Sequence, residues 1–138
     1  MRVSEAMTRD VCLARPDQTL KEAAQLMSRA DIGSLPVEEN DRLIGMITDR
    51  DIAVRAVAQG KGPDTPIREA MTSEVKYCFE DEDIDHVAHN MGDQQIRRLP
   101  VVDRQKRLVG VVALGDVALC PANGSAGEAL SQISRPTH

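Results

Sequence analysis

The sequence predicts an α+β fold made of two β-α-β-β-α units that pack about a pseudo-twofold axis. Two observations lead to this prediction: the chain repeats itself once, and the apolar residues of each repeat switch between helical and strand spacing. A length of 138 residues suits one compact module. A unit of about sixty residues buries little apolar surface alone, so the two units are expected to pack their sheets together.

The repeat is visible as matching motifs at a nearly constant offset. At an offset of 64 residues, E-A-M-T at 5–8 recurs at 69–72. A one-residue insertion then moves the offset to 65, after which R-L-I-G at 42–45 meets R-L-V-G at 107–110. The shared order and spacing indicate duplication of one unit.

A short extended segment opens the first repeat, and a helix follows it. Thr19 and Glu22 have the spacing of a capping box, which predicts that the helix begins at residue 20. Its apolar residues recur on one face up to about residue 30: Leu20, Ala23, Ala24 and Met27.

A hairpin and a second helix complete the first repeat. Apolar runs at 35–37 and 43–47 flank a polar turn, which predicts two paired strands. Thr48 is expected to cap a helix at 49–59. The second repeat predicts a helix at 83–94, strands at 99–102 and 108–112, and a second helix from about residue 115.

Breakers mark the ends of both repeats. Residues 60–65 form a linker, with Thr65 and Pro66 placed as the cap and first residue of a short helix. Pro121 is expected to shorten the last helix of the second repeat and to leave part of the apolar surface of that unit bare. The pattern at 125–133 predicts a tail helix that covers this surface or a second chain.

Composition argues against nucleic acids and membranes as partners. The net charge of −5 is opposite to that of a protein that binds a phosphate backbone, and one Tyr with one Phe gives little surface for stacking bases. No apolar run reaches the roughly 18 residues of a membrane helix. The chain is therefore expected to be soluble and cytoplasmic.

Neither a metal site nor catalytic machinery is predicted. Cys12, Cys78 and Cys120 are widely spaced, which predicts free thiols. His86 and His89 lie three residues apart on a predicted helix, but no third ligand accompanies them. No Ser or Cys lies in a nucleophile-elbow motif, so the chain is not expected to be an enzyme.

These motifs resemble those of a tandem CBS domain pair, the Bateman module. Besides E-A-M-T, the resemblance rests on I-G-S-L-P-V with I-R-R-L-P-V, and on G-M-I-T-D-R-D with G-V-V-A-L-G-D. The chain looks most like the small stand-alone bacterial pairs, a group that includes the hypoxic response protein. The resemblance divides the chain into a first CBS unit at 1–60, a linker at 61–66 and a second CBS unit at 67–121. A C-terminal tail with a short helix follows at 122–138.

The resemblance implies a non-catalytic regulatory module. Such modules bind adenosine-containing ligands, which include AMP, ADP, ATP, NAD and S-adenosylmethionine, in clefts between the two units. The adenine nucleotide is then a regulatory ligand, and no cofactor is required. The resemblance also implies a homodimer and an unidentified regulated protein. Residues 53–58, Met71 and Met91 are compatible with a dimer face and equally with an ordinary core. The alternative is a dimeric protein-interaction module that has lost ligand binding.

The same resemblance assigns ligand-binding roles to eight residues. Asp51 and Asp116 would each accept the two hydroxyls of a ribose. Thr48 would lie near phosphate, at a helix start whose N–H groups are expected to be unpaired. The other five match the segments that hold the adenine base: Ile32, Ser34, Tyr77, Ile96 and Arg98.

The residues themselves leave structural alternatives open. Thr48 and Asp51 also have capping-box spacing, so helix capping alone explains them equally well. In the second repeat Ala113 replaces the hydroxyl while Asp116 remains, and an acid without its capping partner favours the ligand role. Ala113, Leu114 and Gly115 also offer a poorer phosphate contact than Thr48 with Asp51, so we expect one competent site and one that is weak or empty.

The adenine-side residues have plain structural interpretations as well. Both isoleucines are typical of core packing. Arg97 and Arg98 suit a phosphate or carboxylate, but also surface ion pairs. Tyr77 and Phe79 are expected to point to the same side of a strand, either into the core or, for Tyr77, against adenine.

Overall fold

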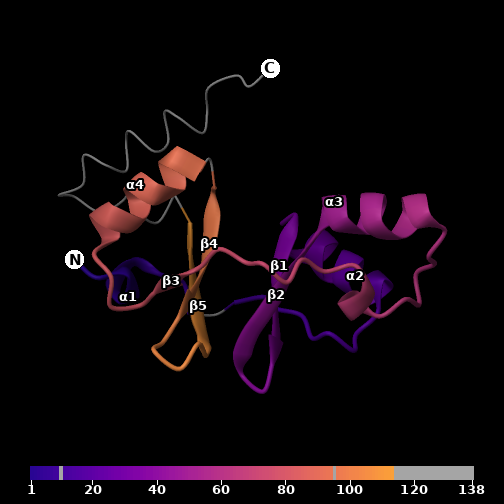
Figure 1. Cartoon of the computed structure of the whole chain (residues 1–138), viewed down its shortest axis with the longest axis horizontal. Helices are drawn as coiled ribbons and strands as arrows, with labels where there is room; N and C mark the ends of the chain where they lie inside the picture. The colour runs from indigo at the N-terminus through magenta and orange to yellow at the C-terminus, as the bar shows by residue number, and fades with distance from the viewer. Residues whose placement is uncertain (10, 95, 114–138) are drawn as a thin grey trace. The chain divides into compact units, whose positions relative to one another are not determined.

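The computed structural model describes residues 1–9, 11–94 and 96–113 (Figure 1). These residues form two compact units, one of Cys12–Val75 and one that joins residues 1–11 to the chain from Lys76 onward. The α+β composition is confirmed, with a two-stranded and a three-stranded sheet. Asp116, the helix from about residue 115, Pro121 and the tail helix lie outside the described residues.

Helix α2 (Leu20–Ala30) of the first unit has the predicted bounds. The Thr19 side chain accepts a hydrogen bond from the Glu22 backbone N–H at 3.1 Å, so the predicted cap is confirmed. Leu20, Ala23 and Met27 are buried, whereas Ala24 is exposed. The apolar stripe is therefore narrower than its sequence pattern indicates.

The predicted hairpin consists of β1 (Ser34–Glu39) and β2 (Arg42–Thr48), which pair in antiparallel fashion. The two turn residues, Asn40 and Asp41, have φ angles of 55° and 66°, which Asn and Asp tolerate better than most residues. The predicted opening strand is reduced to one parallel bridge, between Ala14 and Val37.

The second helix of the first unit covers the predicted residues but changes its hydrogen-bonding pattern along its length. It begins as α3 (Asp49–Asp51), continues as the π-helical η1 (Ile52–Ala56) and ends as the 3₁₀ turn η2 (Val57–Gln59). Gly60, at a φ of 79°, terminates it. Below, α3, η1 and η2 together are called the 49–59 helical segment.

The expected cap at Thr65 is wrong. The short helix η3 (Ile67–Glu69) begins one residue later than expected, with Pro66 in an extended conformation as its N-cap and no side-chain cap. The Thr65 carbonyl instead accepts a hydrogen bond from the N–H of Leu20 at 2.9 Å. Thr65 therefore ties the linker to the start of α2.

The second unit contains the predicted strand, helix and hairpin. Its sheet has the order β3 (Cys78–Phe79), β4 (Arg98–Val102) and β5 (Leu108–Ala113). Strand β3 is parallel to β4, and β5 is antiparallel to β4. Helix α4 (Ile84–Gln94) contributes the buried Ile84, Val87, Ala88 and Met91 to the core.

Each E-A-M-T segment packs with the opposite repeat: residues 5–8 belong to the second compact unit, and residues 69–72 belong to the first. Thr8 pairs with Val111 of β5, and residues 3–6 form the short helix α1 (Val3–Ala6) beside α4. Thr72 pairs with Met46 of β2. The sequence repeats and the compact units thus divide the chain at different places.

Two glycines allow these segments to approach the strands closely. A Cβ atom at Gly45 would lie 2.8 Å from the carbonyl oxygen of Thr72. A Cβ atom at Gly110 would lie 2.7 Å from the carbonyl oxygen of Thr8. The repeated R-L-[IV]-G motif therefore has a structural reason.

Met91 belongs to the core, because only 1% of it is exposed. The interpretation of Met91 as part of a dimer face is therefore wrong. Met71 is partly buried and packs against the core of the first unit. No helix among the described residues is long and apolar enough to span a membrane.

Cys12 and Cys78 are free thiols, as expected, while Cys120 lies outside the described residues. Burial raises the pKa of the Cys78 thiol to about 12. The raised pKa keeps this thiol protonated at pH 8, and the thiolate is the reactive form. We expect iodoacetamide at pH 8 to leave Cys78 unmodified in the folded protein and to modify it in urea, as measured by peptide mass spectrometry. Equal modification of Cys78 in both conditions would contradict this burial.

Candidate functional site

Four of the eight candidate residues lie together in the first repeat, at the open end of the β1-β2 hairpin. Ser34 and Thr48 are direct partners in the strand ladder. Ile32 precedes Ser34 by two residues, and Asp51 follows Thr48 within the first turn of the 49–59 helical segment. The duplicated motifs therefore meet at one place in the fold.

Asp51 and Thr48 form a complete capping box. The N–H of Asp51 donates to Thr48 Oγ1 at 3.0 Å, and the N–H of Thr48 donates to Asp51 Oδ2 at 3.1 Å. Among the residues that the structure describes, Asp51 is the one charged residue that is buried, with 8% of it exposed. The capping interpretation is confirmed for this repeat, so a ligand role for Asp51 comes in addition to capping.

The Asp51 carboxylate has two further neighbours that sequence reasoning missed. Thr72 Oγ1 lies 3.4 Å from each carboxylate oxygen and has one hydrogen to donate, to either of them. Arg55 Nε lies 3.7 Å from Oδ1. The repeated E-A-M-T motif pointed to Thr72, but only the fold shows that its hydroxyl faces the acid.

The carboxylate of Asp51 retains acceptor capacity. An ionised carboxylate offers about four lone-pair sites. The N–H of Thr48 and the hydroxyl of Thr72 occupy two of them. Two sites remain, which matches the number of hydrogens that the two hydroxyls of a ribose donate.

The N–H groups at the start of the helical segment are not unpaired, contrary to expectation. The N–H of Asp49 donates to the Gly33 carbonyl at 2.9 Å, and the N–H of Arg50 donates to Asp49 Oδ1 at 2.8 Å. The capping box satisfies those of Thr48 and Asp51. All four donors are bound within the protein: the side chains of Asp49, Asp51 and Thr48 accept from three of them, and the Gly33 carbonyl accepts from the fourth.

Asp49 is a second acid at this end of the hairpin. It is exposed, and its Oδ2 atom would lie 2.9 Å from a Cβ atom at Gly33. Gly33 separates the candidate residues Ile32 and Ser34. The absence of a side chain at position 33 therefore brings the Asp49 carboxylate close to the segment expected to hold adenine.

The two candidate isoleucines contribute to the cores of their own units. Ile32 is partly buried against the cluster that includes Leu35 and Ile47. Ile96 is partly buried against the cluster that includes Met91 and Leu99. Core packing is confirmed for both, and each keeps some exposed surface.

In the second repeat, Arg98 pairs with Ala113 in the register that joins Ser34 to Thr48 in the first. Arg97 and Arg98 are both exposed. The duplicated geometry is thus retained up to Ala113, with two arginines in place of Gly33 and Ser34. Asp116 lies beyond the described residues.

Tyr77 immediately precedes β3 and lies near Lys106 of the hairpin turn. Its ring is edge-on to that of Phe79, with the ring centroids 5.8 Å apart, and Lys106 Nζ lies 5.4 Å from the Tyr77 centroid. The expectation that both rings share one side of the strand is confirmed. Core packing of Tyr77 is wrong, because 38% of the residue is exposed at the strand end.

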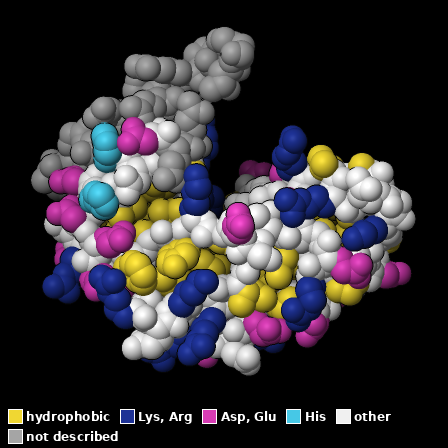
Figure 2. Space-filling view, in the orientation of Figure 1, with side chains coloured by type: hydrophobic (Ala, Val, Ile, Leu, Met, Phe, Trp, Pro, Cys, Tyr) yellow, Lys and Arg dark blue, Asp and Glu magenta, His cyan; other side chains and the backbone are white. Residues whose placement is uncertain are grey.

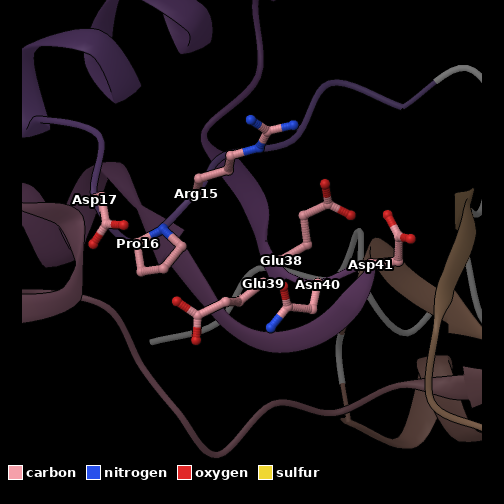
Figure 3. Close-up of a pocket in the computed structure, with 7 residues that line it drawn as sticks. All are labelled: Arg15, Pro16, Asp17, Glu38, Glu39, Asn40 and Asp41. Carbon is pink, nitrogen blue, oxygen red and sulfur yellow. The ribbon is translucent and has the colours of Figure 1, made fainter.

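A polar pocket that the sequence did not predict lies at the opposite end of the first hairpin (Figure 3). It has a volume of about 390 Å³. Beside it, Arg68 forms ion pairs with Glu39 and Asp17, and hydrogen bonds from its guanidinium to these carboxylates raise the pKa of Arg68. The lining residues come from the β1-β2 turn and from the segment before α2: Arg15, Pro16, Asp17, Glu38, Glu39, Asn40 and Asp41.

The two helix histidines make local contacts. His86 Nε2 lies 3.3 Å from the side-chain nitrogen of Asn90, and His89 Nε2 lies 3.1 Å from Asp93 Oδ2. The described part of the chain contains no group of three or more His, Cys, Asp or Glu residues arranged to hold a metal ion.

Comparison with known proteins adds a family to this geometry. The CBS domain model matches residues 3–57 and 67–123. CBS domain-containing protein YhcV of Bacillus subtilis is 46% identical over 133 residues, which cover 96% of this chain and 94% of YhcV.

Similar solved structures include the following two. The crystal structure of Hypoxic Response Protein I with two coordinated zinc ions has a TM-score of 0.75 and 36% identity, and the match covers 86% of this chain and 97% of that one. The CBS domain pair of protein MJ0100, solved with 5′-methylthioadenosine and S-adenosyl-L-methionine, has a TM-score of 0.70 and 35% identity, with coverage of 86% and 93%.

Proposed function

This chain belongs to the CBS domain family, and we propose that it is a non-catalytic regulatory module whose first repeat binds an adenosine-containing ligand. The observation that supports this most is the convergence of Ser34, Thr48 and Asp51 at one end of the hairpin. The CBS pair of MJ0100, which was solved with two adenosine compounds, adds support from a relative.

The proposed roles follow the chemistry of each side chain. Asp51 accepts hydrogen bonds from the two ribose hydroxyls at its two remaining lone-pair sites. The backbone N–H of Thr48 holds the Asp51 carboxylate, and the Thr48 hydroxyl accepts from the N–H of Asp51. Ile32 and Ser34 contact the adenine base. The ligand stabilises the conformation that binds it, and the regulated protein responds to that conformation.

The second repeat is proposed to carry a weaker counterpart of this site. Ile96 and Arg98 correspond to Ile32 and Ser34, and Asp116 corresponds to Asp51. Tyr77 stacks on adenine in this proposal. The replacement of Thr48 by Ala113 removes the hydroxyl that accepts from the Asp51 backbone N–H in the first repeat.

Thermal unfolding with adenosine, AMP, ATP, NAD and S-adenosylmethionine tests the proposal. A ligand at 100 times its dissociation constant stabilises the folded state by about 2.7 kcal/mol. We expect at least one compound to raise Tm in the wild type and to lose this effect in Asp51→Asn, because the amide retains an acceptor for the cap but has no charge. Asp41→Asn, in the turn at the other end of the hairpin, should respond as the wild type does.

Two outcomes of this experiment carry different meanings. An unchanged ligand shift in Asp51→Asn would contradict the role of this acid. A large fall in the ligand-free Tm of Asp51→Asn would show that the amide does not replace the carboxylate in the cap. The ligand-free midpoint is therefore measured first.

A dimeric interaction module without ligand is the second candidate, and an apolar groove on the first unit favours it. The groove is lined chiefly by apolar residues of α2 and the 49–59 helical segment, including Leu20, Ala24, Ile52 and Ala56. Beside them Val54 and Val57 are 46% and 67% exposed, and Figure 2 shows hydrophobic side chains at the surface over this segment. A second copy of the chain is the proposed occupant, since exposed apolar side chains of this kind favour a homodimer.

Sedimentation of the wild type and of Val57→Lys separates the two candidates. A dimer that Val57→Lys converts to a monomer, together with no thermal shift from any adenosine compound, would favour the second candidate. A thermal shift with an adenosine compound favours the first, whatever the oligomeric state.

A further inference from the structure

We infer that the first-repeat site takes an adenosine ligand whose 5′ substituent carries no negative charge, and that Asp49 sets this preference. The inference rests on the proposed function, because it concerns the same end of the β1-β2 hairpin. It names the chemical class of the ligand: a nucleoside with a neutral or cationic 5′ group, as opposed to a nucleotide.

The position of the Asp49 carboxylate is the first argument. Its Oδ2 atom lies over Gly33, between the two residues proposed to contact adenine. Its Oδ1 atom accepts from the N–H of Arg50, which holds the side chain at the helix start. The ion pairs formed among the described residues do not include Asp49, so its negative charge is not neutralised there.

The lack of free donors is the second argument. A helix start binds phosphate through unpaired backbone N–H groups. Here the four N–H groups of residues 48–51 all donate to acceptors within the protein. A 5′-phosphate at this place would meet two carboxylates, and among the described residues the ion pair with Arg55, at 3.7 Å, is made by Asp51 and not by Asp49. A thioether or a sulfonium meets no such repulsion.

The second repeat shows the opposite charge pattern in its sequence. The counterparts of Gly33, Ser34 and Asp49 are Arg97, Arg98 and Leu114. The acid at the helix start is thus replaced by an apolar residue, and two guanidinium groups are added. This difference supports Asp49 as a determinant particular to the first repeat.

Isothermal titration with 5′-methylthioadenosine and with AMP tests the inference. The two compounds share the nucleoside and differ in the charge of the 5′ group. We expect the wild type to bind 5′-methylthioadenosine about tenfold or more tightly than AMP. Asp49→Asn should tighten AMP binding about tenfold and change 5′-methylthioadenosine binding less than threefold, because its amide oxygen still accepts from Arg50. The gap in the wild type should narrow at 1 M KCl.

Two further variants make the readout specific. Asp41→Asn removes an exposed acid at the far end of the same hairpin and should leave the affinity ratio unchanged. Asp51→Asn identifies any AMP that binds outside this site, because such binding persists in that variant. The inference would be overturned if the ratio of the affinities for 5′-methylthioadenosine and AMP were the same in the wild type and in Asp49→Asn. It would also be overturned if the wild type bound AMP more tightly than 5′-methylthioadenosine. Either result would leave the proposed function standing. Failure of both compounds to bind any of these proteins would overturn the proposed function itself.

Discussion

A chain that lacks residues 1–9 is expected to lose the folded state of its second unit. Val3 is fully buried in the core of that unit. Within residues 1–9, 11–94 and 96–113, backbone hydrogen bonds join the segment to the chain beyond it through Met1, Val3, Ser4 and Thr8. Loss of the buried side chain and of these bonds costs more than about 5 kcal/mol, which is comparable to the whole stability of a small unit.

Hydrogen exchange measured by NMR checks this result. The amides of α4 and β4 should lose protection in the truncated chain, while those of α2 in the other unit remain protected. Glu5→Ala in the full chain is the control, because Glu5 is exposed in the same segment. Full protection of α4 in the truncated chain would contradict the assignment of residues 1–11 to the second unit.

Replacement of Gly45 or Gly110 by alanine is expected to destabilise the protein by about 2–3 kcal/mol. The new Cβ would lie 2.8 Å from a backbone oxygen at position 45 and 2.7 Å at position 110, so the E-A-M-T backbone would have to move. Neither glycine has a positive φ, so the effect arises from crowding alone. Urea unfolding of both variants measures it.

Gly62→Ala is the matched control for these variants. A Cβ atom at Gly62 would have no neighbour within 4 Å, and its φ is not positive. Its stability should lie within about 0.5 kcal/mol of the wild type. Wild-type stability of Gly45→Ala and Gly110→Ala would show that the E-A-M-T segments do not pack closely against the strands.

Local signals predicted the elements that local contacts hold together. Thr19 and Glu22 located the start of α2, because the cap bond spans only three residues. The apolar runs around the turn at Asn40 and Asp41 located the first hairpin. In each case the residues that determine the element are close neighbours in sequence.

Contacts between distant segments were not predicted. Nothing in the residues around Thr8 indicates that this threonine pairs with Val111, because the partner lies about a hundred residues away in the chain. The π-helical turn at Ile52–Ala56 was also missed, since an apolar spacing compatible with an α-helix does not exclude it.

The candidate site was predicted in part for the same reason. The duplicated motifs identified Thr48 and Asp51, and strand pairing explains why Ser34 lies beside Thr48. The motifs did not show that the first-turn N–H groups are occupied or that Thr72 and Asp49 face the same region. Those features depend on side-chain rotamers and on the return of the chain after residue 66.

Calorimetric titration of the wild type and of Asp51→Asn with adenosine measures ligand binding at the first repeat most directly. Adenosine carries the base and both ribose hydroxyls and has no phosphate. One strong site per chain in the wild type, weakened at least tenfold in Asp51→Asn at unchanged ligand-free Tm, is the expected result. Equal affinity of the two proteins for adenosine, or two equivalent sites in the wild type, would contradict a site built on Asp51.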